Sequence, residues 1–382
     1  MTWQRVIGQE RVKQILLSAL RNNRLPHAYL FVGSEGVGKD AIAFELARVL
    51  HCEQRGEQAC NQCDSCVRMN SLQHPDVKLV VALPVGKGEK SDDPPFEKLS
   101  AAEIQIIQEQ FKLKAENPYH RITIPKATII KINSIRDIRR ESALSTSGRH
   151  KRVIIVSRAD EMGDAAANTL LKTLEEPSKN TMLILTTAHR DALLSTIVSR
   201  CQVVQFDPLT EPEIRTALIE RSSVEQQQSS LVARLAHGSY TKALELLQDD
   251  VAAQRQQVVT FVRAALGNNI VTLTDAVDEL CAGKNRDLIL RFLNLMLMWI
   301  RDALVLLKGG EVINLDQQDD LQKFVSKFPQ ADLIGILAHI ERAIFLIDRN
   351  VYINLVMLQL AVHLRQGILP GAGIKHLETV ES

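Results

Sequence analysis

Residues 33–40 of this chain read GSEGVGKD and match the phosphate-binding pattern G-x-x-x-x-G-K-[ST] at every fixed position except the last. The apolar run AYLFV precedes them at 28–32, and AIAFELARVL follows at 41–50 with helical spacing. A strand, a glycine loop and a helix in this order predict a phosphate loop, because the first N–H groups of the helix then face the phosphates. The predicted nucleotide-binding residues are Gly33, Gly36, Gly38 and Lys39.

Asp40 replaces the hydroxyl that normally binds Mg²⁺ in this pattern. A carboxylate adds negative charge beside a polyphosphate, which opposes binding of ATP. When no phosphate is bound, the same carboxylate stabilises the N-terminus of the helix by about 0.3–1 kcal/mol, because its negative charge interacts favourably with the helix dipole. Asp40 therefore favours an empty loop over one filled with Mg-ATP.

The second half of an ATPase site is also altered. An ATPase needs acidic residues at the end of a neighbouring strand, to hold the metal and activate water. The strand RVIIVS ends at Ser157-Arg158, and an arginine cannot act as a general base. Asp160 and Glu161 follow too late, and we expect them to face away from the site. The sequence predicts no ATPase activity in the chain alone; the alternative is an autonomous ATPase with unusual motifs.

Beyond this site, apolar runs alternate with helical patterns up to residue 207, which predicts an α/β domain with a parallel sheet. Five strands are predicted, at 28–33, 77–81, 127–132, 152–157 and 182–187. The predicted domains are an α/β domain (1–207, with an insertion near 83–126), a small helical domain (208–252), an all-helical domain (253–370) and a mobile tail (371–382).

Charge and hydropathy exclude some classes of protein. The chain has 382 residues, with 46 basic and 45 acidic side chains and a net charge of +1, which argues against a strongly basic nucleic-acid-binding module. The most apolar segment, 288–307, contains Arg291, Asn294, Arg301 and Asp302, so it is predicted to be a buried helix and not a membrane span. No secretory signal is visible at the start, and we expect a cytoplasmic protein without a membrane partner.

Four of the six cysteines lie within residues 52–66, in the pattern Cys52-x₇-Cys60-x₂-Cys63-x₂-Cys66. In a reducing compartment such spacing favours a metal over disulfides. Four thiolates close a tetrahedral shell around zinc, so the predicted site is structural and not catalytic. The alternatives are free surface thiols and an iron–sulfur cluster. Cys201 and Cys281 are isolated, and core packing explains them.

Several motifs carry a family resemblance. They are LPHAYLFVGSEGVGK (25–39), the cysteine cluster, NTLLKTLEEP (168–177) and TIVSRC (196–201). In this order they resemble the delta-prime subunits of the bacterial DNA polymerase III clamp loader, which are members of the AAA+ superfamily. The likeness covers nearly the whole chain and is weakest over 83–126 and the C-terminal helices. It implies an AAA+ α/β domain with a zinc module, a helical lid domain and a helical collar domain.

The alternative within the same assembly is the gamma/tau motor subunit, which hydrolyses ATP. Those motors keep the hydroxyl after the loop lysine and an Asp-Glu pair on the next strand, and this chain has lost both. They also place an arginine in G-S-x-R-x-A-L, where residues 238–244 here read GSYTKAL and put Thr241. These three departures favour the non-hydrolysing delta-prime type.

The resemblance implies a role in DNA replication within the DNA polymerase III holoenzyme. The implied partners are gamma/tau and delta subunits in a pentameric ring, the sliding clamp and primer–template DNA. Arg200, in Ser199-Arg200-Cys201, would be an arginine finger that completes the ATP site of a neighbouring subunit. The alternative for Arg200 is an ordinary surface ion pair.

Residues 133–140 are predicted to start a helix, with Ser134 as its N-cap. In clamp loaders the corresponding helix faces the duplex, so the resemblance makes Arg136, Arg139 and Arg140 candidate DNA-binding residues, with a solvated helix face as the alternative. Contacts of this kind would be independent of DNA sequence and sensitive to salt. A zinc-dependent DNA-binding module on an inactive ATPase scaffold is a further class, which the near-neutral charge disfavours.

Overall fold

The structure is a computed structural model. It describes residues 3–54, 56–143, 152–177, 180–248, 251–267, 269–282, 286–310, 318–349 and 351–369. The chain folds into two compact units, Met1–Glu245 and Leu246–Ser382.

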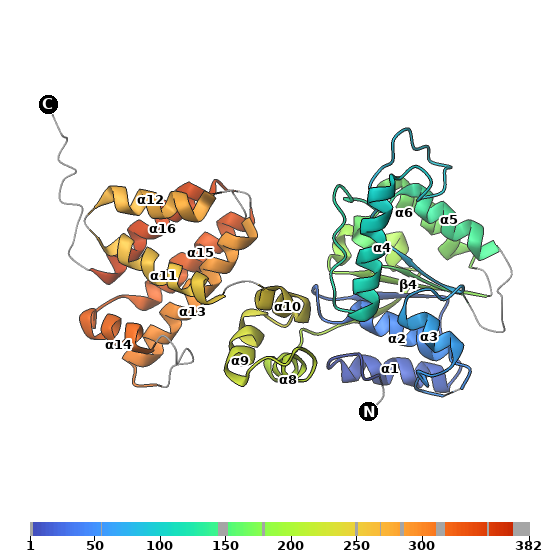
Figure 1. The fold of residues 1–382 in the computed structure, drawn as a ribbon, viewed down its shortest axis with the longest axis horizontal. Helices are drawn as coiled ribbons and strands as arrows, with labels where there is room; N and C mark the ends of the chain where they lie inside the picture. The colour runs from blue at the N-terminus through green and yellow to red at the C-terminus, as the bar shows by residue number, and fades with distance from the viewer. Residues whose placement is uncertain are drawn as a thin grey trace. The chain divides into compact units, whose positions relative to one another are not determined.

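The first unit is built on a five-stranded sheet with the order β2-β3-β4-β1-β5, and all of its strand pairs are parallel. The strands are β1 (Ala28–Val32), β2 (Val77–Val80), β3 (Arg152–Val156), β4 (Thr181–Thr187) and β5 (Gln202–Gln205). The helices are α1 (Glu10–Arg21), α2 (Lys39–His51), α3 (Asp64–Asn70), α4 (Ala101–Glu116), α5 (Ile132–Ala143), α6 (Asp164–Glu175), α7 (Ser195–Val198), α8 (Glu211–Ser222), α9 (Gln226–Leu235) and α10 (Tyr240–Gln248), with 3₁₀ turns at Ala159–Glu161 and Arg190–Ala192. The last three residues of α10 fall in the second unit. In Figure 1, α5 and α6 lie on one face of the sheet and α1, α2 and α3 on the other.

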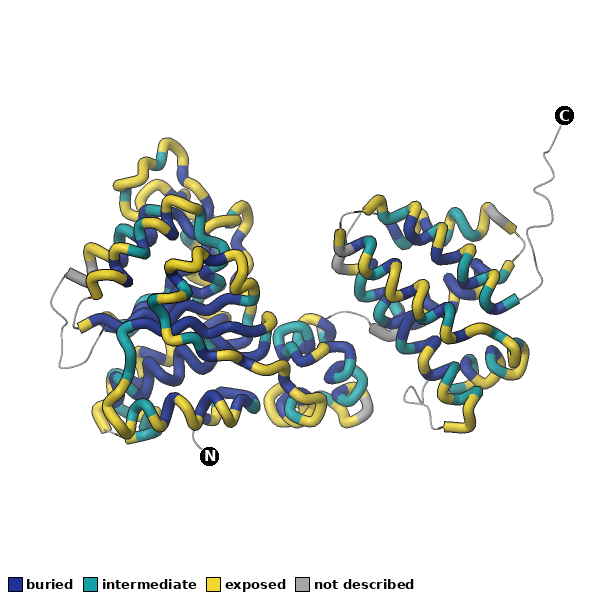
Figure 2. Tube along the Cα trace, turned by 180° about the vertical axis from the view of Figure 1, so that it is seen from behind, coloured by how far each residue is buried: buried dark blue, intermediate teal, exposed yellow. Residues whose placement is uncertain are grey.

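Strands β1, β3 and β4 form the centre of the core, and every residue in them is buried (Figure 2). Parallel strands covered by helices on both faces are continuous apolar runs, which is how these three segments read in the sequence. Because the strands are parallel, their carboxyl ends share one edge of the sheet. The phosphate loop follows β1 at this edge, where ligands of open α/β sheets bind.

Two of the local predictions are wrong. Residues 127–132 form no strand; within them, Ile130 makes one isolated parallel bridge to Met162. Helix α5 already begins at Ile132, so Ser134 lies inside it, 4% exposed, and is not its N-cap. The isoleucines at 132, 135 and 138 recur at a helical interval and pack on the core, which explains the early start. The sequence pattern does not predict strand β5, which begins and ends with a glutamine.

The other four predicted strands are confirmed to within one residue. The predicted helix after Thr210 is confirmed as α8, which Thr210 caps in a reciprocal capping box with Glu213. The helix predicted after Gly238 begins at Tyr240. The insertion 83–126 contains a long loop followed by α4, whose capping box pairs Ser100 with Glu103.

The second unit is helical, and its described residues contain no strand. Its helices are α11 (Val251–Leu266), α12 (Ile270–Cys281), α13 (Arg286–Leu307), α14 (Gln318–Lys327), α15 (Leu333–Asp348) and α16 (Ile353–Ile368). Among the described helices, none is both long enough and apolar enough to cross a bilayer. The predicted tail 371–382 lies outside the described residues, and the predicted boundaries at 207 and 252 stay predictions.

Candidate functional site

The phosphate loop joins the end of β1 to the start of α2. Gly36 (φ 73°) and Gly38 (φ 103°) have backbone angles that favour glycine. The side chain of Lys39 is folded back onto this loop, since its Nζ donates to the carbonyl oxygens of Gly33 (2.6 Å) and Ser34 (2.7 Å). Lys39 is 9% exposed, and this burial lowers its pKa. The loop has the predicted architecture, and its lysine is engaged by the loop itself.

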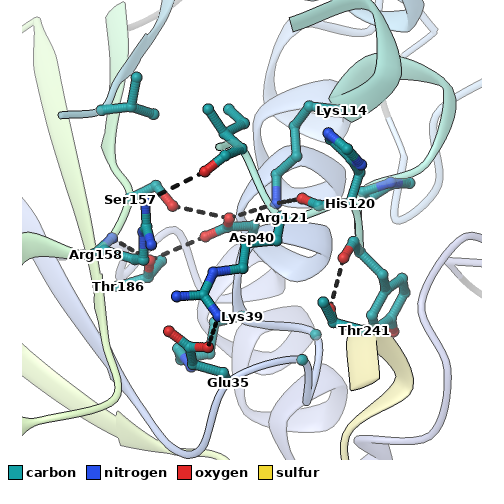
Figure 3. A pocket seen from close by; sticks show the side chains of 16 residues that line it. Glu35, Lys39, Asp40, Lys114, His120, Arg121, Ser157, Arg158, Thr186 and Thr241 are labelled. Atoms are coloured by element: carbon teal, nitrogen blue, oxygen red, sulfur yellow. Dashed lines mark hydrogen bonds and ion pairs between the residues drawn. The ribbon is translucent and has the colours of Figure 1, made fainter. Parts of the chain in front are cut away.

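Asp40 is held by three side chains (Figure 3). Its carboxylate lies 2.7 Å from the ammonium of Lys114 and accepts hydrogen bonds from the hydroxyls of Ser157 (2.9 Å) and Thr186 (2.9 Å). Burial alone would raise the pKa of Asp40, but the charge of Lys114 and the hydrogen bonds from Lys114 and Ser157 leave it below the ordinary value. Asp40 is therefore ionised and neutralised by a side chain of its own chain.

Four elements bring these groups together. Asp40 lies in the first turn of α2, Ser157 follows β3, and Thr186 belongs to β4, so all three lie at the carboxyl edge of the sheet. Lys114 comes from the last turn of α4, in the insertion. Sequence reasoning singled out Asp40 and Ser157 but missed Lys114 and Thr186. No local motif marks either of them, because the contacts are long-range.

Replacing Lys114 with methionine should lower the free energy of unfolding of the first unit by about 3 kcal/mol, because it leaves the Asp40 carboxylate buried without its counter-charge. Urea unfolding followed by the fluorescence of Trp3, in a Trp299→Phe background, measures this value, because the chain has two tryptophans. Lys112→Met, an exposed position on the same helix, is the matched control. Equal losses in the two variants would contradict the assigned role of the pair.

The pH dependence of the free energy of unfolding is a second test of the ion pair between Asp40 and Lys114. The pKa of Asp40 is lower in the folded chain, so its stabilising contribution is complete above the ordinary aspartate pKa of about 4. The contribution is lost as the pH falls through the lower folded value. The stability difference between the unmodified chain and Asp40→Asn should therefore be full at neutral pH and shrink in acid.

The two acidic residues after β3 are engaged by other side chains, and that they face away from the site stays a prediction. Glu161 pairs with Arg158 (3.1 Å), and Asp160 accepts a hydrogen bond from the hydroxyl of Thr187 (2.7 Å). Neither of them lines the pocket above the phosphate loop. Thr241, at the position where the motors carry an arginine, does line it and donates to the carbonyl oxygen of Tyr119 (2.6 Å).

The four clustered cysteines converge as predicted. Their sulfur atoms all lie within 4.8 Å of one another, and those of Cys60 and Cys66 are 3.9 Å apart. Backbone N–H groups of Cys60 and Cys63 donate to the sulfurs of Cys52 (3.2 Å) and Cys60 (3.3 Å). The backbone N–H groups of Gln62 and Cys63 lower the pKa of Cys60 to about 6, which favours a thiolate. Sulfurs bound at about 2.3 Å to one tetrahedral ion lie roughly 3.8 Å apart, so this donor set fits a single metal ion.

Arg200 lies in the turn between α7 and β5 and is about one third exposed. Its guanidinium pairs with Glu175 at the end of α6 (2.9 Å) and donates to the carbonyl oxygen of Thr196 (3.0 Å). The LEEP and SRC motifs, separate in sequence, are thus neighbours in the fold. An ion pair this exposed contributes only about 0–1 kcal/mol, so a phosphate group could displace Glu175 at little cost.

The three candidate DNA-binding arginines lie on α5, and the loop that precedes α4 contacts two of them. Arg136 pairs with Asp92 (2.6 Å), and Arg140 donates to the carbonyl oxygen of Asp92 (3.1 Å). Arg139 is exposed. Lys131 pairs with Glu89 of the same loop (2.6 Å).

The family described as "DNA polymerase III, delta subunit" matches residues 8–210. The chain is 34% identical to DNA polymerase III subunit delta' of Bacillus subtilis over 251 residues, which are 66% of this chain and 63% of that protein. It is 27% identical to the tau subunit of the same organism, over 73% of this chain and 42% of the relative. The matched part of the chain thus spans less than two thirds of each relative.

Among solved structures, a gamma subunit-related protein of DNA polymerase III from Thermotoga maritima aligns with a TM-score of 0.35. Its sequence identity is 14%, and the alignment covers 92% of this chain and 99% of that one.

Proposed function

The chain belongs to the delta-prime family of DNA polymerase III clamp-loader subunits, and from this premise we propose that it is a subunit that does not itself hydrolyse ATP. In this role it assembles with gamma/tau and delta subunits in a cytoplasmic ring. The ring places the sliding clamp on primer–template DNA during replication.

The observation that carries this proposal is the ion pair between Asp40 and Lys114. The Mg²⁺ of an active phosphate loop would be held where this chain has a carboxylate already neutralised by an ammonium group 2.7 Å away. The two acidic residues after β3 contact other side chains of the chain. A metal position taken by an internal ion pair, with both acidic residues after β3 engaged by other side chains, supports an inactive site.

ATP turnover by the purified chain alone tests the proposal against its alternative, a gamma/tau-type motor. We expect no turnover above that of a Lys39→Ala variant, with or without primed DNA. Turnover that Lys39→Ala abolishes would overturn the non-hydrolysing assignment and favour the motor.

The chain contributes one catalytic side chain to the ATP site of a neighbouring subunit. Arg200 is a trans-acting arginine finger that stabilises negative charge on the phosphoryl group transferred in the adjacent subunit, an effect worth about 10³–10⁵ in rate. Its exposed and weakly held pairing with Glu175 supports this role, because the guanidinium can exchange one oxyanion for another.

The remaining proposals concern the metal and DNA. The cysteine cluster holds zinc, and its four thiolates leave no coordination site for water, so the metal is structural. Arg136, Arg139 and Arg140 contact DNA phosphates, and Asp92 must then release Arg136.

The helices of the second unit form the collar that joins the subunits.

A further inference from the structure

The end of α4 and the turn that follows it lie against the phosphate loop. The ammonium of Lys114 pairs with Asp40 and also donates to the carbonyl oxygen of His120 (2.9 Å). Figure 3 shows this side chain reaching down from α4 to the first turn of α2. One buried cation thus ties the turn at 117–120 to the helix that follows the phosphate loop.

Tyr119 is the centre of this turn. It is 3% exposed, and its phenol oxygen accepts a hydrogen bond from the backbone N–H of Ile7 (2.8 Å). Its carbonyl oxygen accepts from Thr241, and its ring meets that of Tyr240 edge-on, with centroids 5.1 Å apart. Tyr119 therefore connects the N-terminal segment to α10 across the loop.

The contact between Tyr119 and the loop is direct. A Cβ added to Gly38 would lie 2.8 Å from the phenol oxygen, so the tyrosine packs on the loop backbone itself. Two residues further on, Arg121 pairs with Glu35 of the loop (3.2 Å). The segment is thus anchored to the loop on both sides of Tyr119.

Little space remains above the loop. The pocket there has a volume of about 80 Å³ and is lined in part by residues 118–122. Pockets that hold small-molecule ligands usually measure about 300–1,000 Å³. A nucleoside phosphate bound to the N–H groups of the loop would therefore have to displace this segment.

We infer that residues 114–122 are a built-in occupant of the phosphate loop, in which Lys114 neutralises Asp40 and Tyr119 covers the loop backbone. The segment excludes nucleoside phosphates even without the Asp40 charge, because Tyr119 and Arg121 hold it on the loop through other contacts. The inference rests on the proposed function and deepens it, because it names the segment that keeps nucleotide from the phosphate loop. It also implies that restoring a hydroxyl at position 40 is not sufficient to recover nucleotide binding.

Fluorescence titration of the full chain with N-methylanthraniloyl-ADP, with and without Mg²⁺, tests this implication. The variants are Asp40→Ser, Lys114→Ala/Tyr119→Ala and the combination of all three changes. We expect no saturable binding by the unmodified chain or by Asp40→Ser, and saturable binding by the triple variant, with an affinity at least tenfold above the weakest that the titration detects. Equal binding by Asp40→Ser and the triple variant, or no binding by a folded triple variant, would overturn the inference.

Hydrogen exchange provides a test that needs no disruptive change. The amide of Ile7 should exchange slowly in the unmodified chain, because its acceptor is the phenol oxygen of Tyr119. Tyr119→Phe keeps the ring and removes that acceptor, so exchange at Ile7 should accelerate at least tenfold, whereas Lys112→Ala should leave it unchanged. Fast exchange in the unmodified chain would overturn the inference.

The outcomes separate this inference from the proposed function. Tight binding by Asp40→Ser alone would remove the segment as the barrier and leave the clamp-loader role and Arg200 untouched. ATP turnover by the unmodified chain would overturn the proposed function itself.

Discussion

Replacing Cys63 with serine is expected to release the metal from the chain and to lower the stability of the first unit by several kcal/mol. Structural zinc contributes roughly 10–16 kcal/mol to the folding of zinc-finger peptides at pH 7, and a site with three thiolates keeps only part of that energy. The four sulfurs all lie within 4.8 Å of one another, so the loss of any one opens the coordination shell. Elemental analysis of the purified chain measures the metal directly.

Trp3 provides the structural readout of the same change. Its indole N–H donates to the carbonyl oxygen of Glu57, between Cys52 and Cys60, and the ring is 3% exposed. Loss of the metal should therefore expose Trp3 and shift its emission to longer wavelength in a Trp299→Phe background.

Cys281→Ser makes the same chemical change outside the cluster and should leave both the metal content and the Trp3 emission unchanged. A purified chain without stoichiometric metal, or a Cys63→Ser variant that retains it, would contradict the assignment. Visible absorption would indicate iron and sulfide in place of zinc.

The parts of the fold that could be predicted are those with a strong local signal. Strands β1, β3 and β4 are continuous apolar runs, because both faces of a covered parallel sheet are buried. The glycine loop and the cysteine spacing are also local patterns. The segment 127–132 is apolar as well, but its isoleucines continue at helical spacing into α5. The periodicity of a short apolar run alone does not separate a buried strand from a buried helix segment.

The parts of the site that could not be predicted depend on contacts between distant segments. Nothing near Lys114 marks it as the partner of Asp40, because the pair forms only when α4 packs beside the sheet. Tyr119 is equally unremarkable in sequence, and its role depends on Ile7 and Thr241. The insertion 83–126, whose role could not be read, supplies both residues.

Arg200→Ala in the assembled clamp loader is expected to reduce ATP hydrolysis stimulated by DNA and clamp by at least tenfold. A tenfold loss corresponds to about 1.4 kcal/mol on the activation barrier, and arginine fingers contribute up to about 10⁵ in rate. Arg200→Lys should recover little of the activity, because an ammonium group cannot form the bidentate hydrogen bonds that a guanidinium forms with a phosphate.

Two control variants separate this effect from a change in folding or assembly. Glu175→Gln removes the ion pair but keeps Arg200, and because the pair is exposed we expect hydrolysis and stability to stay close to those of the unmodified loader. Arg215→Ala removes one exposed positive charge from α8 and should have no effect on hydrolysis.

The most direct test of the account is therefore the stimulated hydrolysis rate of a fully assembled loader with Arg200→Ala, compared with the Glu175→Gln loader at equal subunit composition. We predict a fall of tenfold or more in the first and none in the second. Equal hydrolysis and equal clamp loading by the Arg200→Ala loader and the unmodified one would contradict the claim that this chain contributes an arginine to a neighbour's ATP site.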